Sequence, residues 1–196
     1  MPAVFVVFPP SAGGNHLKNI IVSCYNNDNN EVASIYKPTR RTVHAHIGRN
    51  LQPQQVAAAV THQDQLHILH GHFGEIMSYR EEIKNIIDKK FVIISPETAQ
   101  DRHLLNSRRK GLLYSALDDD DYFDYEQIFL YECFMYHWYL QIPLERIMNI
   151  SVTEMFSKDL NPALDRLEFL LNITADRNKI HQMHDLWLIA NKKWAL

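Results

Sequence analysis

The sequence predicts an α/β protein with three layers, in which a mostly parallel sheet is covered by helices on both faces. Continuous apolar runs recur along the chain, such as VFVVF at 4–8 and FVII at 91–94. Segments with helical spacing follow these runs, and buried strands alternating with helices are typical of parallel sheets. The length of 196 residues, with 46% hydrophobic and 22% charged residues, predicts one domain spanning 1–196.

The first 26 residues predict a strand, a glycine-bearing loop and a helix. Val4–Phe8 is a β-branched and aromatic run typical of a strand that is buried on both faces. The turn-rich stretch PPSAGG follows it. Apolar side chains then recur with helical spacing from Leu17 to Cys24, and Asn15 is the expected N-cap.

The remaining elements follow in order. In the N-terminal half we expect a short strand at Thr42–Ile47, a helix at Gln54–Val60, a buried strand at Leu66–His72, a helix from Ile76 to Ile87 and a buried strand at Phe91–Ile94. In the C-terminal half we expect a helix at Glu97–Arg109 ended by Gly111, a long aromatic helix at Tyr122–Leu140, a strand at Ile147–Val152, a helix around Leu164–Leu171 and a last helix at Arg177–Trp194.

Charge and composition narrow the classes of partner. Twenty Lys and Arg against 23 Asp and Glu give a formal net charge of −3, which provides no overall field for nucleic acid or an anionic membrane. No apolar run approaches the length of a membrane span, and the N-terminus lacks the basic region of a signal peptide. Two cysteines cannot build a disulfide framework. We therefore expect a cytoplasmic protein that binds neither nucleic acid nor membranes.

The glycine loop is the first candidate site. Glycine is scarce in this chain, with six residues in all, yet Gly13 and Gly14 stand together after a buried strand and before a helix. A helix N-terminus has amide groups without partners and a positive dipole end, so it attracts phosphate or sulfate. Ser11 and Asn15 could add hydrogen bonds. The loop has neither Gly-Lys-Ser/Thr nor GxGxxG, and the glycines could equally serve the geometry of a tight turn alone.

This loop resembles the 5′-phosphosulfate loop of sulfotransferases, whose pattern is Pro-Lys-Ser-Gly-Thr-Thr-Trp-Leu. The segment Pro10–Leu17 reads PSAGGNHL, and it matches that pattern at Pro10, Gly13 and Leu17. Further features follow in the family's order and at similar spacing. These are a strand that ends in histidines (LHILHGHF), a strand where the family has its 3′-phosphate segment (KFVIISP), and a late strand and helix (RIMNISVTEMF, ALDRLEFLLNI).

The resemblance implies a P-loop NTPase-like fold of the sulfotransferase type and a nucleotide donor such as 3′-phosphoadenylyl sulfate (PAPS), with no metal. The acceptor would be a hydroxyl or amine of a small molecule or glycan. The donor would be held by the loop residues Ser11, Ala12, Gly13, Gly14, Asn15 and His16.

Two positions depart from the family's pattern. The family's loop lysine aligns with Ser11, and Lys18, one helical turn inside the following helix, is the candidate that could reach back. The family's arginine after the third strand aligns with Ser95 or Pro96, neither of which binds a phosphate as arginine does. Residues of the following segment could substitute for it, namely Arg102, Ser107 and Arg108, together with the adjacent Arg109.

Sulfuryl transfer also needs a base for the acceptor hydroxyl. Histidine titrates near neutrality, so His70 and His72 are the candidates. Ligands of open α/β sheets lie beyond the carboxyl ends of the strands, which favours His72.

Other readings remain open. One is a P-loop kinase, disfavoured because no magnesium-binding carboxylate directly follows a strand. Another is a binding module that has the fold without catalysis, and the sequence does not specify an oligomeric state. Histidine pairs at 44 and 46, 70 and 72, and 181 and 184 could ligate zinc, but no HExxH or Cys-x-x-Cys pattern occurs. The cation cluster KPTRR at 37–41 is typical of a solvated turn, although it could neutralise a leaving phosphate.

Overall fold

Four parallel strands form the sheet of the computed structural model, which describes residues 3–25, 53–64, 66–112 and 142–196. The strands are β1 (Ala3–Val7), β2 (His67–Gly71), β3 (Lys89–Ser95) and β4 (Ile147–Ser151), in the order β2-β1-β3-β4. Every residue of β1 is buried, as expected for a strand between two layers. The predicted α/β class and parallel sheet are confirmed.

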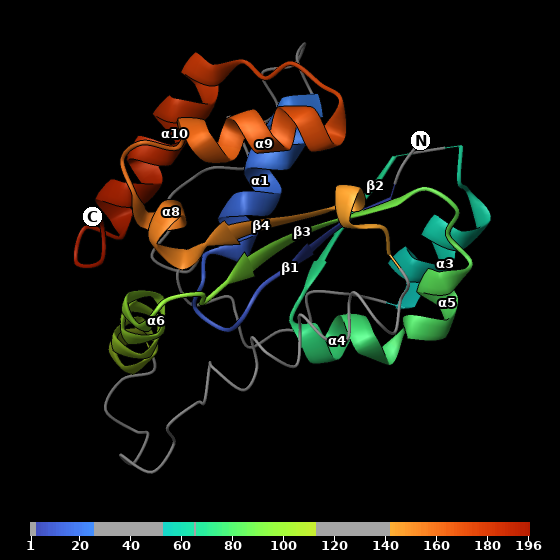
Figure 1. Ribbon diagram of the computed structural model, residues 1–196, viewed down its shortest axis with the longest axis horizontal. Coiled ribbons are helices and arrows are strands. Elements are labelled where there is room, and N and C mark those ends of the chain that lie inside the picture. The colour runs from blue at the N-terminus through green and yellow to red at the C-terminus, as the bar shows by residue number, and fades with distance from the viewer. Residues whose placement is uncertain (1–2, 26–52, 65, 113–141) are drawn as a thin grey trace.

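Helices lie on both faces of this sheet (Figure 1). They are α1 (Gly14–Tyr25), α3 (Pro53–Thr61), α4 (Phe73–Ser78), α5 (Arg80–Lys84), α6 (Ala99–Leu112), α8 (Val152–Phe156), α9 (Asn161–Leu171) and α10 (Arg177–Ala190), with a 3₁₀ turn η3 at Leu144–Arg146. Val4 and Val6 of β1 share one apolar core with α1, α9 and α10, whereas Phe5 and Val7 share another with α3, α4 and α5. This arrangement is compatible with the predicted three layers.

The helix predicted from Ile76 to Ile87 is two short helices instead. The backbone of Tyr79 (φ −108°, ψ 22°) ends α4 and begins α5. Ile76, Ile83 and Ile86 are nevertheless all buried. The spacing identified the buried face in part, because Ile87, the predicted end of the helix, is 82% exposed.

Several predicted boundaries are wrong, among them the end of the last helix, which lies at Ala190 and not at Trp194. α1 begins at Gly14, so Asn15 lies inside its first turn and is not the N-cap. α6 continues through Gly111, where a Cβ would lie 2.8 Å from Cζ2 of Trp194, so this glycine allows close packing and does not end the helix. β4 ends at Ser151, whose hydroxyl accepts the Glu154 amide and caps α8.

Several predicted features lie outside the described residues: the strand at 42–47 with its histidine pair, the cluster KPTRR and the long helix at 122–140. Among the described helices, none combines the length and the apolar character that crossing a membrane requires.

Candidate functional site

The turn between β1 and α1 lies at the carboxyl edge of the sheet. From β1 the chain continues to β2 on one side, whereas from β3 it continues to β4 on the other. The loops after β1 and β3 therefore flank a topological switch point, which is where open α/β sheets bind their ligands. The β1–α1 turn, here Phe8–Gly13, is in this position because of the strand order alone.

Two residues of this turn have left-handed backbone conformations. Ser11 has φ 71° and Gly13 has φ 87°. A positive φ is unfavourable for serine, so the surroundings must hold it there. Gly14 has another constraint, because a Cβ at this position would lie 1.9 Å from the ring of Phe8. The positive φ at position 13 and the close Phe8 ring at position 14 each require glycine, so the geometry of the turn accounts for both glycines without a ligand.

The amide groups at the start of α1 have the arrangement that anion binding needs. The amides of His16 and Leu17 donate to the Gly13 carbonyl at 2.9 and 3.1 Å, and the Ala12 amide donates to Pro9 at 3.2 Å. The amides of Gly13 and Gly14 donate no hydrogen bond within the described part of the chain. These two N–H groups lie at the positive end of a 12-residue helix.

His72 lies beside this turn. Gly71 pairs with Val7 in the parallel register, so His72 follows β2 next to Phe8. Its Nδ1 is 2.9 Å from the Phe8 carbonyl, and the two rings meet edge to face at 4.9 Å. A carbonyl only accepts hydrogen bonds, so the proton of the neutral ring is on Nδ1. The Nε2 lone pair is then available to accept a proton.

His70 is the second histidine at this edge. Its ring stacks on that of Phe8, with a centroid distance of 6.3 Å and an interplanar angle of 20°. The structure therefore brings both predicted base candidates to the residue that precedes the loop. Which of them acts as a base stays a prediction.

The structure places three of the α6 residues that were considered for phosphate binding in different surroundings. Arg108 is 6% exposed and donates from Nη1 to the Ser11 carbonyl, so it contacts the turn. Burial lowers the pKa of Arg108 to about 10. Ser107 is exposed, and Arg102 donates to the carbonyls of Pro96 and Glu97 at 3.3 Å.

His16 directs its ring away from solvent, into a buried cluster with α10. Its Nε2 lies 3.0 Å from Nδ1 of His184, and its ring stacks on Trp187 at 4.4 Å and 1°. Nε2 of His184 donates to the Ser157 carbonyl at 2.7 Å, so Nδ1 of His184 accepts from His16. Burial, followed by the nearby His184 and Arg108, holds the pKa of His16 well below its usual value.

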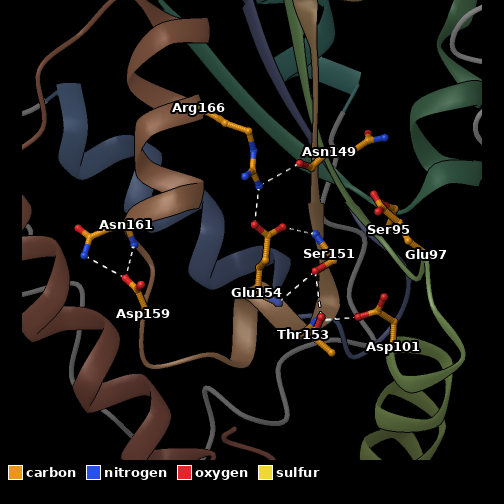
Figure 2. A network of polar contacts seen from close by, with 10 residues as sticks. All are labelled: Ser95, Glu97, Asp101, Asn149, Ser151, Thr153, Glu154, Asp159, Asn161 and Arg166. Atoms are coloured by element: carbon orange, nitrogen blue, oxygen red, sulfur yellow. Dashed lines mark hydrogen bonds and ion pairs between the residues drawn. The ribbon is translucent and has the colours of Figure 1, made fainter.

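A polar network occupies the β3–β4 half of the same edge (Figure 2). The fully buried carboxylate of Asp101 accepts from the Thr98 amide at 2.8 Å and from the Thr153 amide at 2.7 Å, which ties α6 to α8. Glu154 accepts from Arg166 at 2.7 Å and from the Ser151 amide at 2.9 Å. These contacts are satisfied within the protein, so the network is structural support for the edge.

Lys18 is half-buried on α1, and this burial lowers its pKa. Within the described ranges, no group of three or more potential metal ligands comes together. The pair His181 and His184 diverges, because His181 is only half-buried and its Nε2 contacts Oδ1 of Asn161 at 3.0 Å, whereas His184 is buried against His16.

The sequence did not identify Phe8, Trp187 and Asn191 as parts of the site. The helical spacing of Trp187 in the last predicted helix favours a core position, with a lid over a pocket as the alternative. Trp187 is buried, and its contact with the glycine turn depends on docking between distant elements. No known protein family, curated protein or solved structure matches this chain.

Proposed function

We propose that the chain binds a nucleotide through a phosphate or sulfate group at the β1–α1 turn and transfers a sulfuryl group to a hydroxyl or amine, as a P-loop enzyme similar to sulfotransferases. The observation that carries this proposal is the position of His72. Its Nδ1 is bonded to the carbonyl of Phe8, the residue at which the turn begins. A proton acceptor and an anion-binding helix end therefore share one edge of the sheet.

Each group has a distinct role in this reaction. The Gly13 and Gly14 amides and the Ser11 hydroxyl hold the charged oxygens of the donor, while Lys18 supplies positive charge from the next turn of α1. The acceptor oxygen bonds to sulfur as the bond from sulfur to the phosphate oxygen breaks. The acceptor proton passes to Nε2 of His72, and the phosphate leaves with the electron pair.

The donor site is tested with an isosteric pair at Ser11. Calorimetry should detect binding of adenosine 3′,5′-bisphosphate to the unmodified chain. We expect Ser11→Asp to weaken it by about 100-fold, because a carboxylate in the turn repels the phosphate, whereas Ser11→Asn should bind within about threefold. Both side chains tolerate the positive φ, so the pair differs in charge and not in fold.

The two alternative functions predict different results in the same calorimetric titration. Binding only to ATP with magnesium would support the kinase, and a chain that binds no nucleotide would support a binding module of another kind. Equal affinities for Ser11→Asp and Ser11→Asn would place the phosphate somewhere other than the turn.

The base is tested by His72→Asn. An asparagine amide can still donate to the Phe8 carbonyl, as Nδ1 does, but it has nothing in place of Nε2. We expect kcat to fall by about 10²–10⁴-fold while the affinity for adenosine 3′,5′-bisphosphate stays unchanged. His70→Asn is the matched control. If His70→Asn lost turnover and His72→Asn kept it, the roles of the two histidines would be reversed.

A further inference from the structure

We propose that Arg108 and Asn191 are positioning residues for the β1–α1 turn, setting the shape of the anion site without contacting the ligand. This inference rests on the proposed function, because it concerns the same turn. Under this proposal, the backbone conformation of the turn is determined by elements that are far from it in the sequence, namely α6 and the end of α10.

Both left-handed residues of the turn are held from outside it. The carbonyl of Ser11 accepts a hydrogen bond from Nη1 of Arg108, 97 residues away. At Gly13, the indole of Trp187 occupies the space beside Cα, since a Cβ there would lie 3.0 Å from Cζ2. Unfavourable backbone conformations persist only where neighbouring groups fix them. Here the fixing groups are one guanidinium and one indole.

Asn191 connects the guanidinium of Arg108 to the backbone of Trp187. It is 3% exposed, and its Oδ1 accepts from Nη2 of Arg108 at 2.9 Å. Its Nδ2 donates to the Trp187 carbonyl at 2.8 Å. Removing this amide would therefore free Nη2 of Arg108 and loosen the contact of that guanidinium with the Ser11 carbonyl.

Aromatic rings complete the cage around Arg108. Its Cζ lies 4.8 Å from the ring centroid of Phe156, 5.6 Å from that of Trp187 and 5.7 Å from that of Trp194. These rings fix the plane of the guanidinium, and cation–π attraction compensates part of its desolvation. A guanidinium held this rigidly fixes the carbonyl to which it donates.

The charge of Arg108 also acts at the turn. In the described part of the chain, no carboxylate lies within ion-pair distance of Arg108. A buried charge is normally paired, so this cation adds its field to the positive end of α1. An anion bound at the turn would be its nearest counter-ion.

The test compares Asn191→Ala with Ser23→Ala. Ser23 is also buried and faces α10, through the Met183 sulfur at 3.9 Å, but it lies outside the turn and its cage. We expect Asn191→Ala to move the amide resonances of Gly13 and Gly14 and to weaken binding of adenosine 3′,5′-bisphosphate about tenfold. Ser23→Ala should change neither, and the Gly74 resonance should stay in place in both variants.

The positioning role would be overturned if the amide resonances of Gly13 and Gly14 stayed in place in Asn191→Ala. It would also be overturned if these resonances moved equally far in Ser23→Ala. If Asn191→Ala does not fold, Asn191→Ser is measured in the same way, because its shorter side chain cannot reach Arg108. If the unmodified chain binds no nucleotide, the proposed function fails, and the resonances alone then decide whether Asn191 positions the turn.

Discussion

Replacing Gly14 by alanine is expected to lower the free energy of unfolding by about 3 kcal/mol, and the melting temperature by about 6–12 °C. The added Cβ would lie 1.9 Å from the Phe8 ring, which is fully buried and cannot move without disturbing the core around β1. Thermal unfolding followed by circular dichroism measures the change.

Gly74→Ala is the matched control for this prediction. Gly74 is exposed in α4, and no atom lies within 4 Å of the position that its Cβ would take. Alanine there is expected to be neutral or to stabilise by about 0.5–1 kcal/mol, because it favours helix more than glycine does. Equal effects in the two variants would mean that Phe8 does not pack against Gly14 as described.

Acidification is expected to destabilise the fold below about pH 6.5, the ordinary pKa of histidine. Burial lowers the pKa of both His16 and His184, so the unfolded chain takes up protons that the folded chain does not. This contribution to stability is complete above that pH and is lost as the pH falls toward the folded-state pKa values. At about pH 5 the loss cannot exceed about 2 kcal/mol for each imidazole, because proton uptake by the unfolded chain, with its ordinary pKa of about 6.5, sets that limit.

Denaturant unfolding between about pH 8 and about pH 5 measures this loss. His16→Gln places an amide donor near the position of Nε2, so it can still donate to His184 but does not titrate. We expect its stability to depend less on pH. His103→Gln, at an exposed position on α6, is the control and should leave the dependence unchanged. If His16→Gln kept the full pH dependence of the free energy of unfolding, groups other than His16 would be its cause.

The two central strands of the sheet were predictable because they are apolar on both faces. The runs at 4–8 and 91–94 can be buried only between two layers of helices. The end of β4 was not predictable from apolar pattern alone, because Val152 is apolar and β-branched yet begins α8, where the cap formed by Ser151 and Glu154 decides the boundary. Helix ends depend on such local hydrogen bonds more than on periodicity.

The candidate site was predictable in part. The position of the turn after β1, with His72 at the neighbouring strand end, follows from parallel pairing once the strands are known. The cage around Arg108 does not, because it joins α6, α8 and α10 through contacts that no local pattern encodes. The aromatic spacing of Trp187 indicated a core position without indicating which element it would contact.

The hydrogen bond between His16 and His184 spans 168 positions in the sequence. A ribosome makes β1 and the glycine turn long before it makes α10, and contacts so distant in sequence form late because the intervening chain must first be closed into a loop. For most of translation, the turn is therefore present in the nascent chain without the α10 residues that contact it in the folded protein. The anion site proposed at this turn would then be complete only at the end of folding, when α10 docks.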